Sequence, residues 1–143
     1  MATERSASVV WNGDLMSGSG VIGQVESGAF GPLDVSWAAR AEDPNGKTSP
    51  EELIAAAWAA CFAMALSHGL AQDGTPPESL ATSATVTFQP GEGIVKGALT
   101  VTGSVPGVDA DGFQAAAQTA VENCPVSKAL SGVPEVTLDA SLQ

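Results

Sequence analysis

One stretch of the sequence, Leu53–Leu66, consists entirely of apolar residues, and it constrains the fold more than any other feature. Before it, Ser49 is a good N-cap residue, Pro50 suits the first helical position, and Glu52 completes a Ser-x-x-Glu capping box. This pattern predicts a helix that begins at Pro50 and ends near Gly74. Because no polar stripe interrupts the apolar run, we expect the helix to be buried on every side.

The apolar run is shorter than the roughly 20 residues that a membrane-spanning helix needs. It is therefore interpreted as a core helix, and no membrane partner is expected. A chain of 143 residues has little other apolar material with which to surround such a helix. Packing two copies of the helix together would complete its burial, so we predict a homodimer.

Length and charge limit the organisation and the partners of the chain. At 143 residues it is predicted to be a single domain, residues 1–143, in which five Lys and Arg residues face 16 Asp and Glu residues. The resulting net charge of −11 repels phosphate backbones, so nucleic acid is not expected as a partner. The N-terminal residues 1–6 show no signal-peptide pattern, which predicts a cytoplasmic protein.

The remaining pattern predicts an α+β fold. A second helix, capped by Asp109, is expected to run to Leu130 with a restart at Cys124 and Pro125. The element order is then β-β-β-α-β-β-α-β, which lacks the alternation of a doubly wound sheet. Arg40 is expected where the third strand leaves its sheet. The predicted strands are 8–11, 20–25, 33–40, 79–89, 94–105 and 134–140.

Two segments, Ser49–Phe62 and Asn123–Ser127, together with Arg40 upstream, resemble the OsmC/Ohr family of osmotically inducible and organic-hydroperoxide-resistance proteins. The match is closer to the OsmC branch. The resemblance implies antiparallel sheets wrapped around a buried central helix in an intertwined homodimer. It also implies a thiol-dependent peroxidase that reduces organic hydroperoxides during oxidative stress. The implied catalytic residues are Cys61 as the reactive cysteine, Cys124 as the resolving cysteine, Arg40 and Glu51.

The chemistry of these residues can be examined without the family. Only a thiolate attacks a peroxide, and apolar burial pushes Cys61 toward the unreactive thiol. The guanidinium of Arg40 would favour the thiolate, and Arg40 in turn needs a carboxylate, for which Glu51 is the better candidate because Glu52 belongs to the capping box. Glu51 and Cys61 lie ten residues apart, or about 15 Å along one helix. A Glu51 that serves Cys61 is therefore expected to come from the other subunit.

The roles of the two cysteines are less clear from the residues alone. Cys124 precedes Pro125 at the start of a short helix, where unpaired N–H groups lower the pKa of a thiol and favour Cys124 as the attacking group. A low pKa equally makes Cys124 a good leaving group when a disulfide is reduced. The family pattern gives the first attack to Cys61. In a reducing compartment, a disulfide between the two is expected to form and break.

The family mechanism has Cys61 become a sulfenic acid, which condenses with Cys124 to a disulfide that an external dithiol reduces. Trp58 and Phe62 are predicted to wall an apolar substrate pocket. His68 is interpreted as a surface residue at the helix end. The two cysteines and one histidine lack metal-ligand spacing, so neither a metal nor another cofactor is expected. The rival interpretation is a non-enzymatic stress-induced or small-hydrophobe-binding protein whose cysteines lie too far apart to pair.

Overall fold

The computed structural model describes residues 1–143, and its two sheets with a long helix confirm the α+β class. The chain forms two compact units, Met1–Leu53 and Ile54–Gln143. The elements are β1 Val9–Asn12, β2 Ser19–Ile22, β3 Leu33–Val35, α1 Trp37–Ala41, α2 Pro50–Gln72, β4 Ser79–Gln89, β5 Gly93–Ser104, α3 Ala110–Asn123, α4 Pro125–Ala129 and β6 Glu135–Leu142.

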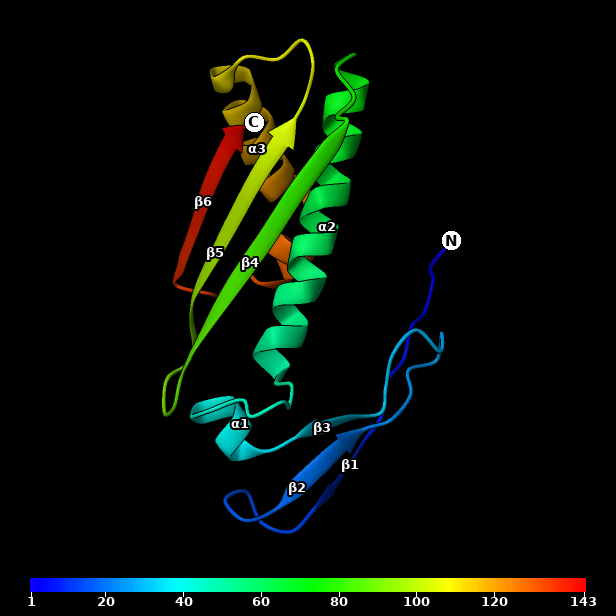
Figure 1. Ribbon diagram of the computed structural model, residues 1–143, viewed down its shortest axis with the longest axis vertical. Coiled ribbons are helices and arrows are strands. Elements are labelled where there is room, and N and C mark those ends of the chain that lie inside the picture. Colours follow the sequence, from blue (N-terminus) through cyan, green and yellow to red (C-terminus); the bar gives the residue numbers. More distant parts are fainter. The chain divides into compact units, whose positions relative to one another are not determined.

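The C-terminal unit has a closed hydrophobic core. Its sheet has the order β4-β5-β6, and α2 and α3 lie against the same face of that sheet (Figure 1). Alternate residues of β5, such as Leu99 and Val101, point into the core, as the period of two in a strand requires. The buried residues of this core are Trp58, Phe62, Leu66, Leu70, Leu99, Val101, Val105, Phe113, Ala117, Ala120 and Cys124.

The pairing within this sheet differs from the expectation of purely antiparallel sheets. β4 and β5 form the predicted antiparallel hairpin, but β6 pairs with β5 in parallel, with Lys96 opposite Glu135 and Gly103 opposite Leu142. A parallel pair requires a crossover connection, and α3 and α4 supply it. The sequence therefore indicated these strands but not the direction of the last one.

Helix α2 begins and ends as predicted, although only half of the expected capping box is formed. The Ser49 hydroxyl accepts a hydrogen bond of 3.1 Å from the Glu52 backbone N–H. The Glu52 carboxylate does not return to Ser49 but accepts a hydrogen bond of 2.9 Å from the Thr48 hydroxyl. At the other end the helix stops at Gln72, just before Gly74 adopts a φ of +84°, which favours glycine.

The expectation that α2 is buried on every side is wrong for the single chain. Trp58, Phe62, Leu66 and Leu70, spaced four residues apart, form its buried stripe, while Met64 is 72% exposed. By length and composition α2 could cross a membrane, since an 18-residue window has a mean hydropathy of 1.7, but core helices of soluble proteins meet the same criterion. Only 22% of that window is fully buried, and exposed residues such as Met64 leave part of this apolar helix uncovered.

The N-terminal unit contains the antiparallel sheet β1-β2-β3 and the short helix α1. The predicted third strand, residues 33–40, is too long, because β3 ends at Val35 and α1 begins at Trp37. The Ser36 hydroxyl caps α1 by accepting a hydrogen bond of 3.1 Å from the Ala39 backbone N–H. Arg40 consequently lies in the last turn of α1 and not at the end of a strand.

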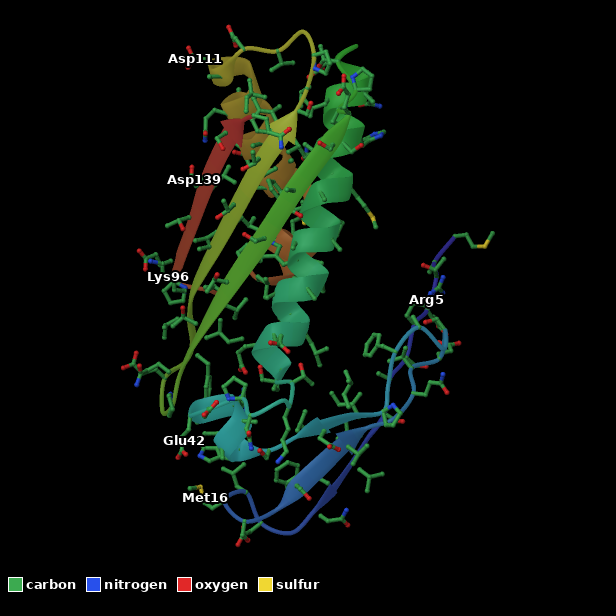
Figure 2. The ribbon with its side chains drawn as sticks, in the orientation of Figure 1. Arg5, Met16, Glu42, Lys96, Asp111 and Asp139 are labelled. Carbon is green, nitrogen blue, oxygen red and sulfur yellow. The ribbon has the colours of Figure 1, made fainter.

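This unit has almost no core of its own. Its buried hydrophobic residues are Ile22 and Ala39. Met16, in the β1–β2 hairpin loop, extends its side chain outward and is 71% exposed (Figure 2). The other large hydrophobic side chains exposed on secondary structure or loops of this unit are Val9, Val10, Trp11, Leu15, Val21 and Phe30. The N-terminal unit thus presents an apolar surface that it does not bury within itself.

Candidate active site

In the N-terminal unit the structure pairs Arg40 with Glu51, the carboxylate expected from the sequence. Arg40 Nε donates to Glu51 Oε1 at 3.0 Å and to Oε2 at 3.1 Å, while Arg40 Nη2 donates to Oε1 at 2.7 Å. The Glu51 side chain is 8% exposed and that of Arg40 is 32% exposed. A forked, charge-assisted pair of this kind fixes the plane of the guanidinium and neutralises the buried carboxylate.

In the C-terminal unit the two cysteines lie together, and neither forms a disulfide in this structure. Cys61 is half-buried in α2, and Cys124, the N-cap residue of α4, is fully buried. The two thiols influence each other, and this interaction raises the pKa of Cys61 and lowers that of Cys124. The structure therefore brings together the two thiols that the rival interpretation had placed too far apart.

Burial is the main reason why the pKa of the Cys61 thiol lies above its ordinary value. The backbone N–H of Val126 opposes this effect, and the Cys124 thiol adds to it. No cation is among the groups that shift the pKa of Cys61. In these surroundings Cys61 is a thiol at neutral pH, and a positive charge is still required to make it nucleophilic.

The pKa of Cys124 is shifted the other way. Burial raises it, but the backbone N–H of Ser127, the Cys61 thiol and the Ser127 hydroxyl together hold the pKa of Cys124 below its ordinary value. The thiol makes no capping hydrogen bond of ordinary geometry, yet the N–H dipoles at the start of α4 still favour the thiolate. The conflict seen in the sequence thus persists in the structure, where Cys124 is the more acidic thiol.

Cys61 opens into a groove between α2 and α3 with a volume of about 730 Å³, which we call the Cys61 groove. Besides Cys61, its walls are Met64, Ala65, His68, Gly69, Gln72, Asp73, Gly112, Ala115, Ala116, Thr119, Ala120, Asn123 and Pro125. Cys124 does not line it. A ligand in this groove would therefore meet the Cys61 sulfur and not that of Cys124.

Trp58 and Phe62, the predicted pocket walls, are 1% and 0% exposed and do not line the Cys61 groove. Trp58 lies over β5 at Gly97, where an added Cβ would come within 2.5 Å of the indole ring. Its Nε1 donates a hydrogen bond of 2.7 Å to the Ser127 hydroxyl. Their role as walls of a substrate pocket stays a prediction.

Ser127 is the residue of this site that reasoning from the sequence missed. It contacts Trp58 from 69 positions away, so no local pattern links the two. The only available signal was its place two residues after Pro125 in the Cys-Pro-Val-Ser segment, at the third position of α4. His68 lines the Cys61 groove, and no three His, Cys, Asp or Glu side chains are gathered in a way that could hold a metal ion.

Comparison with known proteins connects this geometry to a family. A family model described as OsmC-like protein matches residues 43–139. The chain is 40% identical to Peroxiredoxin OsmC of Escherichia coli (strain K12), over 100% of this chain and 99% of that protein. A crystal structure of an organic hydroperoxide resistance protein OsmC from Legionella pneumophila is 25% identical with a TM-score of 0.68, covering 96% of both chains. The organic hydroperoxide resistance protein OhrB of Bacillus subtilis is 26% identical with a TM-score of 0.66, covering 96% of this chain and 98% of that chain.

Proposed function

Because the chain belongs to the OsmC-like protein family, we propose that it is a thiol-dependent peroxidase that reduces organic hydroperoxides to alcohols. The observation that carries this proposal is the pair of neighbouring, interacting thiols, Cys61 and Cys124, in the C-terminal unit. One of them opens into a groove and the other is fully buried behind it. Relatives named as a peroxiredoxin and as organic hydroperoxide resistance proteins support the same activity.

In the proposed cycle, the Cys61 thiolate attacks the outer oxygen of the hydroperoxide. The O–O bond breaks, the leaving alkoxide takes a proton to become the alcohol, and Cys61 becomes a sulfenic acid. Cys124 then attacks the Cys61 sulfur, the hydroxyl leaves as water, and a disulfide forms. An external dithiol returns both cysteines to the reduced state.

Arg40 is proposed as the cation that Cys61 lacks within its own surroundings. A guanidinium beside the sulfur would lower the pKa of Cys61 and bind the peroxide oxygens. Glu51 holds that guanidinium in a fixed plane through three hydrogen bonds. Since Glu51 and Cys61 are ten residues apart on α2, about 15 Å along its axis, the Arg40–Glu51 pair is proposed to serve the Cys61 of a second subunit.

The uncovered apolar surfaces support a homodimer. Part of the apolar surface of α2, including Met64, is exposed, and the N-terminal unit buries only Ile22 and Ala39 among its hydrophobic residues. A second copy of the chain carries the same two apolar surfaces. A two-fold interface between the copies would cover the surface of α2 and that of the N-terminal unit together. Sedimentation equilibrium tests this proposal, and a monomer at micromolar concentration would contradict it.

The Cys61 groove suits an organic hydroperoxide better than hydrogen peroxide, because alkyl groups gain free energy when they leave water for its alanine-rich walls. A cytoplasmic location is proposed because two cysteines that cycle between thiol and disulfide need a reducing compartment. The reductant is proposed to be a dithiol.

The deciding experiment is the intact mass of the reduced protein after one equivalent of cumene hydroperoxide. We expect a loss of two hydrogens per chain, together with one equivalent of cumyl alcohol. In Cys61→Ser both should be absent, while Cys124→Ser should retain alcohol formation and gain one oxygen as the trapped sulfenic acid. An unchanged mass in the wild-type protein would favour the non-enzymatic interpretation.

A further inference from the structure

We propose that reduction of the disulfide has a fixed direction: the external dithiol attacks the sulfur of Cys61, and Cys124 leaves as a thiolate that Ser127, oriented by Trp58, stabilises. This inference rests on the proposed function, because it concerns the step that restores the reduced enzyme. It assigns to Ser127 and Trp58 a positioning role, since both act through Cys124.

Access to the two sulfurs is unequal. Cys61 lines the Cys61 groove, whereas Cys124 is 0% exposed and is absent from the walls of that groove. A thiolate must approach the sulfur it attacks along the S–S bond, so the attacked sulfur has to be reachable from solvent. Only Cys61 meets this condition, and Cys124 becomes the leaving group.

The hydrogen-bonding chemistry around Ser127 fits a stabilised leaving group. The indole N–H of Trp58 is a donor only, so the Ser127 hydroxyl must act as the acceptor of their 2.7 Å hydrogen bond. The single proton of that hydroxyl is then available to a different acceptor. Ser127 occupies the third position of α4, the position whose side chain faces back to the N-cap residue, which is Cys124.

In agreement with this position next to the N-cap residue, the Ser127 hydroxyl contributes to holding the pKa of Cys124 below its ordinary value. An O–H that donates to sulfur favours the thiolate over the thiol. A leaving thiol with a lower pKa departs faster in thiol–disulfide exchange.

Packing holds the indole in place for this task. The six-membered ring of Trp58 lies so close to Gly97 that an added Cβ would come within 2.5 Å of one ring carbon and 2.6 Å of another. Trp58 is 1% exposed, so its ring is enclosed on its other sides as well. With the ring packed against β5, the indole N–H holds the Ser127 oxygen as an acceptor, which in the proposed step leaves the Ser127 proton for Cys124.

The reduction proceeds through a mixed disulfide between Cys61 and the dithiol. A thiolate of the dithiol forms a bond to Cys61 Sγ, the Cys61–Cys124 bond breaks, and its electron pair leaves on Cys124. The second thiol of the reductant then attacks the reductant's other sulfur, which is bonded to Cys61 in the mixed disulfide. This closes a cyclic disulfide in the reductant and releases Cys61 as a thiolate. The dithiol thus loses two electrons and two protons, which the two cysteines gain.

The first test identifies which sulfur is attacked. The protein is oxidised with diamide, which forms the disulfide without any peroxide chemistry, and is then treated briefly with the monothiol 2-mercaptoethanol. After an acid quench and alkylation, peptide mass spectrometry should locate the mixed disulfide on Cys61 and the alkyl group on Cys124. A mixed disulfide located mainly on Cys124 would overturn the proposal.

The second test measures the rate at which dithiothreitol reduces the diamide-oxidised protein. Ser127→Ala should slow this step about tenfold at pH 7, because a charge-assisted hydrogen bond to the leaving thiolate is lost. Trp58→Phe, which keeps an aromatic ring but removes the N–H, should slow it less, and Ser127→Thr, which keeps a hydroxyl, should restore most of the rate. Ser131→Ala is the matched control, since Ser131 lines the same small cavity as Ser127 without bonding to Cys124.

A structural defect would not reproduce one further readout. In a Cys61→Ser background, the thiolate absorbance of Cys124 should titrate at higher pH after Ser127→Ala and at the original pH after Ser127→Thr. Wild-type reduction rates and an unshifted titration in Ser127→Ala would sink the inference and leave the proposed function standing. A wild-type protein that does not react with cumene hydroperoxide would instead defeat the proposed function, while the diamide-based measurements could still be made.

Discussion

The two compact units of the chain differ in what holds them together: a hydrophobic core in the C-terminal unit and a partly buried ion pair in the N-terminal unit. The C-terminal unit closes a core of eight aliphatic and aromatic side chains together with small residues and Cys124, and its one ion pair, Lys96 with Glu135, lies on the surface at 3.8 Å. The N-terminal unit buries only two hydrophobic residues but contains the partly buried Arg40–Glu51 pair.

This difference teaches where each part of the proposed chemistry resides. The unit with the core contains the two thiols, with Cys124 buried in the core and Cys61 packed against it. The unit without a core contains the cation and shows exposed apolar side chains, as a segment does when its partner surface is a different molecule. If Arg40 serves the Cys61 of a second subunit, as proposed, activity should depend on dimerisation.

The largest expected effect comes from truncating equivalent side chains in the two units. Phe113→Ala removes a ring that is 0% exposed and should lower the free energy of unfolding by about 3–5 kcal/mol at any protein concentration. Phe30→Ala removes a ring that is 45% exposed and should cost less than about 1 kcal/mol in dilute solution. Urea denaturation at two protein concentrations provides the measurement.

Concentration separates the two substitutions. If the exposed apolar surface of the N-terminal unit is covered in a dimer, the cost of Phe30→Ala should grow as the protein becomes more concentrated. Equal and concentration-independent losses for both variants would mean that the N-terminal unit has a core of its own, and the contrast between the units would fail.

The next effect concerns the pH dependence of the peroxide reaction. Burial raises the pKa of Cys61 above its ordinary value, so without a cation the thiolate fraction increases only as pH rises through that higher pKa. Arg40→Met should therefore reduce the rate with cumene hydroperoxide about 10- to 100-fold at pH 7, or about 1.4–2.8 kcal/mol, and much of the loss should be regained toward pH 10.

Stopped-flow traces of tryptophan fluorescence between pH 6 and pH 10 would record this profile. Arg5→Lys is the control, because Arg5 is an exposed residue that precedes the first strand. A profile in Arg40→Met that is lower by the same factor at every pH would separate Arg40 from the ionisation of Cys61 and assign it to substrate binding alone.

The sequence predicted most of the elements that depend on local signals. Ser49 and Asp109 cap their helices as expected, with hydrogen bonds of 3.1 and 2.8 Å, and the β4–β5 hairpin lies within one residue of its predicted bounds. Glu51 was predicted as the partner of Arg40 because Glu52 was assigned to the capping box, and Arg40 and Glu51 form an ion pair in the structure. Each of these inferences needed only neighbouring residues or a single charge balance.

What could not be predicted depends on contacts between distant parts of the chain. The parallel direction of β6 is set by the crossover through α3 and α4, which strand patterns do not encode. The exposed face of α2 escaped prediction because an all-apolar helix has no polar stripe to indicate which side faces away from its own sheet. The Trp58–Ser127 hydrogen bond joins residues 69 positions apart, and α1 was missed because the residues after Ser36 continue a short strand pattern.

A smaller effect is expected from two adjacent carboxylates. Glu51 is 6% exposed and accepts three hydrogen bonds from Arg40, so Glu51→Gln should lower the free energy of unfolding by about 1–2 kcal/mol. The exposed Glu52 side chain accepts a single hydrogen bond, from the Thr48 hydroxyl, so Glu52→Gln should change the free energy of unfolding by less than about 0.5 kcal/mol. Thermal unfolding monitored by circular dichroism compares them, and equal effects would show that the Arg40–Glu51 pair does not help to hold the N-terminal unit.

The smallest expected effect is that of the surface ion pair of the C-terminal unit. Lys96 and Glu135 are 3.8 Å apart with side chains 44% and 60% exposed, so water screens their attraction. Lys96→Met should change the free energy of unfolding by no more than about 0.5 kcal/mol, and the change should disappear in 1 M salt, where charges are screened within about 3 Å. A loss above about 1 kcal/mol that survives high salt would show that the C-terminal unit also relies on its charges, because a packed core alone should make this pair dispensable.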